Sequence, residues 1–129
     1  MTNEDKKYDL QERFIAFAVR VINLSESLPD SKSGNHVRSQ ILRSGTSPAP
    51  NYGEAQSAES RADFVHKLKL SLKELRETEV WLKIIAKAEM VKPVDKLLPL
   101  LKETDELISI LCKSIQTVKK NQIDAKKIN

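Results

Sequence analysis

Hydrophobic side chains recur every three or four residues over most of this chain, a period typical of amphipathic helices rather than of strands. In the first such segment, residues 10–28, the inward positions are Leu10, Phe14, Phe17, Val21, Leu24 and Leu28. Pro29 follows and disfavours helical geometry at the residue before it. The pattern therefore predicts a first helix that ends at this proline.

Two prolines interrupt the second periodic segment, which begins near Asn35 and includes Pro48 and Pro50. A proline lacks an amide hydrogen and crowds the carbonyl four residues earlier, yet it suits the first turn of a helix. We therefore expect the second helix to be kinked near Pro48 and Pro50, or to restart around residues 46–47.

A capping signal marks the start of the third segment. Ser60 followed by Asp63 resembles a capping box, with aspartate in place of the usual glutamate. The helix is predicted to run to about Glu89. Its inward positions are Val65, Leu68, Leu72, Leu75, Leu82 and Ala86.

The fourth segment opens after Lys92, with Pro93 in its first turn. It keeps the same period at Val94, Leu97, Leu101, Thr104, Ile108, Leu111, Ile115 and Val118. The last residues, 120–129, are expected to be frayed. Because short connections favour antiparallel neighbours, the chain is predicted to be an all-α, up-down-up-down antiparallel four-helix bundle, one domain over residues 1–129.

The composition narrows the class of protein. The 129 residues include three glycines, five prolines and 5% aromatic residues, too little turn and strand chemistry for an all-β fold. The one cysteine, Cys112, excludes an internal disulfide and a cysteine-rich zinc site. No stretch approaches the roughly 18 apolar residues of a membrane span, and the N-terminus lacks a signal-peptide core. We therefore expect a cytoplasmic protein without membrane contact.

Two predicted helices carry more apolar surface than one core requires. Beside its seam, the first helix has Ile15, Ala18, Val19 and Ile22. The third has a second stripe at Leu70, Glu74, Glu77, Trp81, Ile84 and Ala88. Leftover apolar stripes mark contact sites, so a homo-oligomer interface is predicted at Ile15, Val19, Ile22, Leu70, Trp81 and Ile84. The alternative for Trp81 is that it only covers the rim of the core.

A basic stripe also lies on the third predicted helix. Lys69, Lys73, Arg76, Lys83 and Lys87 fall within about 80° of arc, and the net charge of the chain is +4. In an oligomer, repeated copies of this stripe would form a surface for RNA or DNA. The alternative is a solvated face with pairs Lys73–Glu77, Arg76–Glu79 and Lys83–Glu79 at helical spacing.

A polar constellation occupies the second helix. Arg43, Ser47, Asn51 and Glu54 are spaced four, four and three residues apart, so one helix face carries all four. Arg43 is a natural ion-pair partner for Glu54 or for Glu74. A structural network that fixes the register of the bundle is favoured over catalysis, and its predicted members are Arg43, Ser47, Asn51, Glu54, Ser71 and Glu74.

This constellation resembles the signature of the small bacterial four-helix-bundle proteins encoded in 23S rRNA intervening sequences. In that family an arginine is followed by a serine four residues on, an asparagine four further, and then a glutamate, as in the segment Leu42–Ala55 here. The family also has a phenylalanine, a serine and a glutamate on its third helix, which Phe64, Ser71 and Glu74 match. The resemblance covers about residues 10–90, and it departs from many relatives at both prolines of the second helix and at Leu70.

The resemblance implies a left-handed bundle that assembles into a ring, commonly a homopentamer. A related group, the accessory variability proteins of diversity-generating retroelements, forms basic pentamers that bind nucleic acid and a reverse transcriptase. The implied partners are further copies of the chain, RNA or DNA, and a protein such as a reverse transcriptase. We therefore expect a binding scaffold, and the alternative is a structural interaction module that binds no nucleic acid.

Catalytic motifs are sparse. The sequence has no glycine-rich phosphate loop, no nucleophile elbow and no cysteine or histidine cluster, so we expect no catalytic residue, metal or cofactor and a protein that is not an enzyme. The one suggestive spacing is Arg61 and His66 with four residues between them. This spacing resembles the motif of HEPN-class ribonucleases, which makes a HEPN-like endoribonuclease the alternative function.

Overall fold

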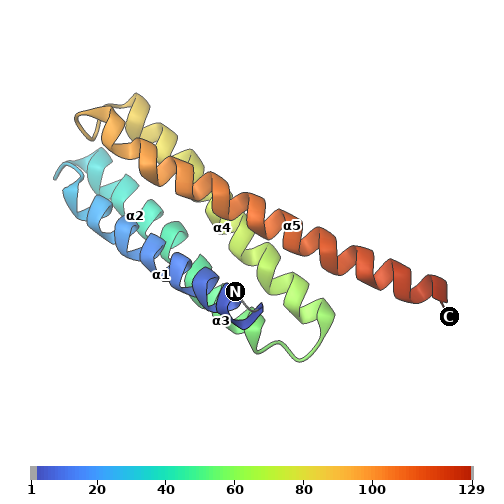
Figure 1. Ribbon diagram of the computed structural model, residues 1–129. Coiled ribbons are helices and arrows are strands. Elements are labelled where there is room, and N and C mark those ends of the chain that lie inside the picture. Colours follow the sequence, from blue (N-terminus) through green and yellow to red (C-terminus); the bar gives the residue numbers. More distant parts are fainter. Residues whose placement is uncertain (1–2, 129) are drawn as a thin grey trace.

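The computed structural model describes residues 3–128 of the chain, with side chains described for residues 10–125. Its helices are α1 (Asn3–Ser27), α2 (Lys32–Thr46), α3 (Pro48–Gln56), α4 (Arg61–Lys87), the 3₁₀-helix η1 (Val94–Leu97) and α5 (Leu98–Ile128). The long helices α1, α4 and α5 and the pair α2–α3 form the four rods of the bundle, and Figure 1 shows neighbouring rods running antiparallel. The all-α, up-down-up-down bundle predicted from the sequence is therefore confirmed.

α2 begins at Lys32 rather than near Asn35, so the predicted start was wrong. Ser31 is the N-cap, and its hydroxyl accepts a hydrogen bond of 3.0 Å from the amide of Gly34. A side-chain acceptor at this position satisfies one of the free amides of the first turn. The turn after Pro29 is therefore shorter than the sequence suggested.

The second rod is interrupted where the prolines predicted. The amide of Ser47 donates to the carbonyl of Arg43, and the amide of Asn51 donates to the carbonyl of Ser47, both at 3.2 Å. Pro48 and Pro50 contribute no amide hydrogen between these two bonds. The rod is therefore kinked at Ser47, with Pro48 in the first turn of α3.

Both ends of α4 have defined caps. The hydroxyl of Ser60 accepts a hydrogen bond of 3.0 Å from the amide of Asp63, as the sequence predicted. At the other end the amide of Glu89 donates to Ala86 at 3.1 Å and the amide of Met90 donates to Ile85 at 3.0 Å. This is the Schellman pattern, and Glu89 takes the left-handed conformation there, with φ of 54°.

The fourth rod starts with η1 and continues as α5. Pro99 lies in the first turn of α5, where its missing amide hydrogen breaks no helical bond. The helix continues to Ile128, through most of the segment 120–129 that we expected to fray, and residue 129 lies outside the described residues. Figure 1 shows the C-terminal end of α5 reaching past the turn between α3 and α4.

The core lies along the inner faces of all four rods. Fully buried large side chains include Phe14, Phe17 and Val21 of α1, Ile41 of α2, Leu68, Leu75, Leu82 and Ile85 of α4, and Leu107 and Leu111 of α5. In α4 the buried residue is Ile85 rather than the predicted Ala86, and in α5 Leu107 is buried rather than Ile108. Where two adjacent residues are both apolar, the period alone does not say which one faces inward.

The contacts between the rods are uneven. α4 packs closely against α3, α5 and α2, whereas α1 and α5 make few contacts. Arg13 bridges these two helices, with Nη2 at 2.6 Å from Glu103 Oε1 and 3.0 Å from Glu106 Oε2. The hydrogen bond to Glu103 raises the pKa of Arg13. Because α4 packs against α2, α3 and α5, it is the central helix of the fold. The candidate functional residues lie mostly on α4.

Candidate functional site

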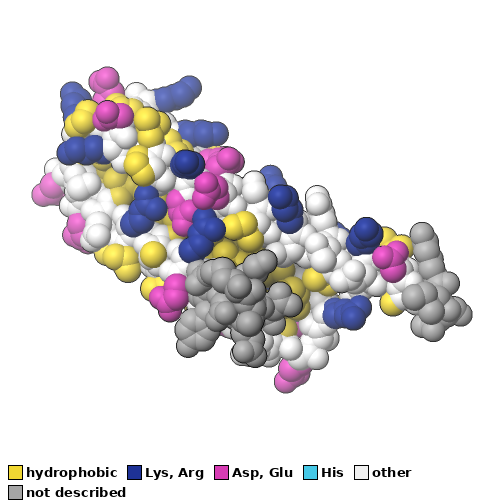
Figure 2. Space-filling view, viewed as in Figure 1, with side chains coloured by type: hydrophobic (Ala, Val, Ile, Leu, Met, Phe, Trp, Pro, Cys, Tyr) yellow, Lys and Arg dark blue, Asp and Glu magenta, His cyan; other side chains and the backbone are white. Residues whose placement is uncertain are grey.

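The predicted basic stripe forms a row along the outside of α4. We call Lys69, Lys73, Arg76, Lys83 and Lys87 the basic row, and all five residues are exposed. Figure 2 shows that lysine and arginine side chains are spread over the surface of the bundle. The row spans about 27 Å at 1.5 Å per residue. Val80 lies among these residues and is 55% exposed. The helix thus presents regularly spaced cations on the flank that it turns away from α2.

Few acidic groups neutralise the basic row. Lys83 Nζ lies 3.7 Å from Glu79 Oε1, and Arg76 Nη2 lies 3.5 Å from the sulfur of Cys112. Of the three pairs in the alternative interpretation, Lys83–Glu79 is formed, whereas Lys73–Glu77 and Arg76–Glu79 are not formed among the side chains of residues 10–125. Glu77 bonds instead to Arg43. Within this part of the chain, Lys83 is therefore the member of the row that has a carboxylate partner.

Arg43 is the centre of an ion cluster between α2 and α4. Its Nη1 lies 3.0 Å from Glu74 Oε2, and its Nη2 bonds to Glu77. Trp81 Nε1 also donates to Glu77, at 3.2 Å, and the Trp81 and His36 rings are roughly perpendicular at a centroid distance of 6.0 Å. Of the two partners predicted for Arg43, the structure places it with Glu74.

The other polar residues of the predicted network have separate partners. Ser47 donates to the carbonyl of Arg43 at 2.6 Å, and Ser71 donates to the carbonyl of Pro48 at 3.2 Å. Glu54 pairs with Lys67 at 2.7 Å, which raises the pKa of Lys67. The half-buried Asn51 makes no side-chain hydrogen bond within the described chain. The bonds of Ser71 and Glu54 join α4 to α3, whereas the Ser47 bond lies within the second rod.

The two apolar stripes differ in how far they are covered. On α1, Ile15 is 43%, Val19 49% and Ile22 41% exposed. On α4, Leu70 and Trp81 are half-buried, and the Trp81 ring packs against the His36 ring of α2. Ile84 is 39% exposed. Of the two predicted stripes, that of α1 is therefore the more exposed, and Trp81 packs partly buried against the core.

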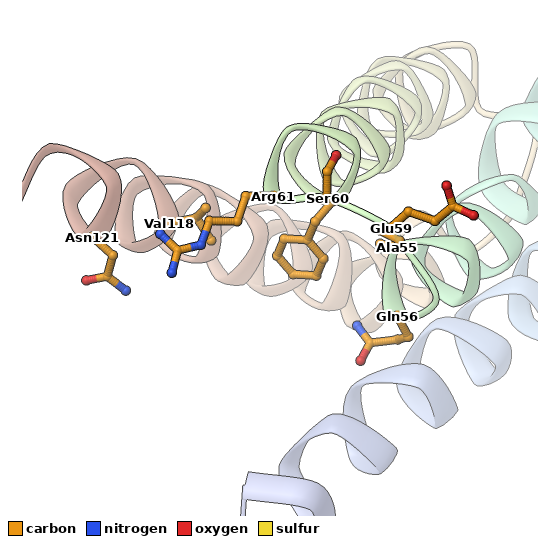
Figure 3. A pocket seen from close by; sticks show the side chains of 9 residues that line it. Ala55, Gln56, Glu59, Ser60, Arg61, Val118 and Asn121 are labelled. Carbon is orange, nitrogen blue, oxygen red and sulfur yellow. The ribbon is translucent and has the colours of Figure 1, made fainter. Parts of the chain in front are cut away.

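A cavity of about 430 Å³ lies where the turn between α3 and α4 meets α5. Its lining consists of Ala55, Gln56, Ala58, Glu59, Ser60, Arg61, Phe64, Val118 and Asn121. Figure 3 shows Arg61 extending from the start of α4 toward Val118 of α5, while the Glu59 carboxylate points the other way. Sequence reasoning missed this cavity because its walls lie more than fifty residues apart along the chain.

The two residues of the alternative ribonuclease motif are not brought together around this cavity. Arg61 lines it, whereas His66 is exposed and is not part of its wall. The described residues contain no group of three or more His, Cys, Asp or Glu side chains placed to hold a metal ion. Within the same part of the chain, no helix is both long and apolar enough to cross a membrane.

The fold and these surfaces define a helical-bundle protein with a basic face. The family model described as 23S rRNA-intervening sequence protein matches residues 6–113. The chain therefore belongs to the 23S rRNA-intervening sequence protein family, as its signature segment predicted.

A solved structure supports the same assignment. It is a crystal structure from Bacteroides thetaiotaomicron VPI-5482, described as a protein with unknown function from the S23 ribosomal protein family. It is 35% identical to this chain, with a TM-score of 0.78, and the match covers 86% of this chain and 98% of that one. No curated protein matches the sequence.

Proposed function

We propose that this protein is a non-enzymatic scaffold that self-associates and binds RNA through the basic row of α4. The observation that carries the proposal is the row itself: five cations on one helix flank, of which only Lys83 has a carboxylate within ion-pair distance among the described side chains. Cations that are already paired would have to exchange one partner for another. Unpaired cations bind phosphates with a net release of counterions.

Self-association strengthens this proposal in a specific way. The exposed apolar residues Ile15, Val19 and Ile22 supply surface for a contact between copies. Each added copy repeats the basic row, and a field summed over several rows attracts a polyanion more strongly than one row does. The name of the family refers to intervening sequences of 23S rRNA, which makes RNA the first ligand to test.

The experiment is an RNA titration over a range of salt concentrations. A fluorescent RNA is bound to the wild type, to the row variant Lys69→Gln/Lys73→Gln/Lys83→Gln, and to a control variant Lys32→Gln/Lys96→Gln/Lys113→Gln. The control residues are lysines outside the row, so both variants lose the same formal charge. The control separates a specific surface from a general effect of net charge.

We expect the affinity of the wild type to fall steeply with salt. The slope of log affinity against log salt should be shallower in the row variant, by about 0.7 to 0.9 for each phosphate that the variant no longer neutralises. The control variant should keep the slope of the wild type. Equal slopes for the two variants, or no binding by the wild type at low salt, would reject the proposal.

A further inference from the structure

We infer that the cavity beside Arg61 binds one unpaired nucleotide of an RNA strand. This inference rests on the proposed RNA-binding function and names the form of nucleic acid that it recognises. The cavity, of about 430 Å³, falls within the usual range for small-ligand pockets. Its lining combines the three kinds of group that a nucleotide requires, namely a flat apolar wall, a cation and hydrogen-bonding amides.

Phe64 supplies the aromatic part of the wall. Phe14 and Phe17 are buried completely in the core, whereas Phe64 is only partly buried and lines the cavity. Ala55 and Val118 extend the apolar surface of the lining. A nucleobase stacks on such a surface, because every base has an apolar face and aromatic side chains accept it.

Arg61 supplies the cation. Its side chain is exposed, and it forms no ion pair with the described carboxylates, although Glu59 is a near neighbour in the chain. In Figure 3 its guanidinium lies on the α5 side of the cavity, and the Glu59 carboxylate is turned away. A guanidinium in this position has donors free for a phosphate, which it binds with two parallel hydrogen bonds.

Two amide side chains complete the lining. Gln56 lies at the end of α3 and Asn121 lies on α5, and both line the cavity. Neither makes a side-chain hydrogen bond within residues 10–125. A primary amide offers both a donor and an acceptor, which is the pattern presented by the edge of a base. A free phosphate would leave both amides and Phe64 without a role.

The bound form must be an unpaired nucleotide. In a duplex the faces of each base are stacked and its pairing edge is occupied, so neither is available to a cavity in a protein. An unpaired base in a loop or at a strand end exposes both its faces and its pairing edge. The basic row binds phosphates of any strand, and the cavity would add a preference for single strands.

The first test titrates adenosine 5′-monophosphate into the isotopically labelled full chain, followed by amide NMR signals, with inorganic phosphate in a parallel titration. We expect shifts at Ala55, Phe64 and Asn121 with the nucleotide and much weaker binding of phosphate. Arg61→Gln and Phe64→Leu should each weaken nucleotide binding by about tenfold. Arg20→Gln, which removes an exposed arginine of α1, should have no effect.

The second test compares a single-stranded and a duplex RNA. The cavity variants should bind the single strand more weakly and the duplex as tightly as the wild type does, whereas the row variant should bind both more weakly. Nucleotide binding that the cavity variants weaken, without RNA binding by the wild type, would reject the proposed RNA-binding function but not the cavity. Three results would overturn the inference about the cavity. They are phosphate binding as tight as nucleotide binding, no nucleotide binding at all, and equal effects of Arg61→Gln and Arg20→Gln.

Discussion

The hydroxyl groups of Ser44 and Thr78 lie 2.9 Å apart and share a hydrogen bond, and both side chains are completely buried between α2 and α4. The Thr78 hydroxyl also lies 2.8 Å from the carbonyl oxygen of Glu74. Two turns earlier on α4, Ser71 donates to the carbonyl of Pro48. These hydroxyls tie the central helix to the second rod next to the kink, where the prolines remove backbone hydrogen bonds.

Thr78→Val should destabilise the fold because it preserves the shape of the side chain and leaves the Ser44 hydroxyl buried without this partner. We expect the free energy of unfolding to fall by about 1–3 kcal/mol. The double variant Ser44→Ala/Thr78→Val should recover part of this loss, since both polar partners are then absent. Urea denaturation followed by circular dichroism measures the unfolding free energy of the wild type, of Ser44→Ala, of Thr78→Val and of the double variant. A double variant that loses the sum of the two single effects would contradict this interpretation.

Gly45 is a point of close approach between α2 and α1. A Cβ atom at this position would lie 2.6 Å from Cγ1 of Val21, so Gly45→Ala should lower the unfolding free energy by about 1–3 kcal/mol. Val21→Ala in the same chain should relieve the clash. Gly53→Ala is the matched control, because a Cβ there meets only the flexible end of Gln11, at 3.2 Å. Thermal denaturation should show a lower midpoint for Gly45→Ala than for the wild type, whereas Gly53→Ala should not lower the midpoint.

The helices were predictable because their ends carry local signals. Pro29, Pro48 and Ser60 act on the backbone within one turn, so their positions indicate the end of α1, the kink of the second rod and the start of α4. The pairing of side chains across rods has no such signal. Glu77 belongs to the same sequence pattern whether it bonds to Lys73 or to Arg43, and only the packing of α2 beside α4 decides between them.

The cavity was unpredictable for a related reason. Its wall combines residues 55–64 with Val118 and Asn121 of α5, and no period or spacing in the sequence connects these two segments. Their contact depends on how far α5 extends along α4. The basic row, in contrast, is visible in the sequence because one helix carries all of it.

Tyr52 should make the stability of the fold depend on alkaline pH. It is buried against Phe14, with ring centroids 5.1 Å apart, and burial raises its pKa. The unfolded chain therefore loses the tyrosine proton first, at about pH 10. Stability that is intact below that pH falls as the pH rises toward the higher pKa of the folded state.

Tyr52→Phe removes this titration, and the comparison isolates it from the lysines. The difference in unfolding free energy between the wild type and the variant should be constant from about pH 7 to pH 9 and should then shift in favour of the variant as the pH rises above about 10. Urea denaturation at each pH measures it. A difference that stays constant across the whole range would show that Tyr52 ionises equally well in both states.

RNA should remain intact in the presence of the protein. Arg61 and His66 lie at the start of α4, but His66 is outside the wall of the cavity that Arg61 lines, so this cavity does not bring the two side chains together around a substrate. We expect the RNA to remain full-length after prolonged incubation with the wild type and with His66→Ala. Gel electrophoresis measures the length of the RNA. Cleavage by the wild type that His66→Ala abolishes would contradict the non-enzymatic proposal and favour the HEPN-like alternative.

Self-association should depend on the exposed face of α1. Val19 is 49% exposed at the centre of the stripe formed with Ile15 and Ile22, and a charge buried there in a contact between copies would lack a partner. We expect Val19→Glu to weaken association by at least about tenfold, measured by sedimentation at micromolar concentration. Val94→Glu adds the same charge at an exposed valine of η1 and should leave association unchanged. The interface on α1 would be rejected if the wild type sediments as a single folded chain, or if the two substitutions have equal effects. Repeated basic rows could then no longer explain stronger RNA binding.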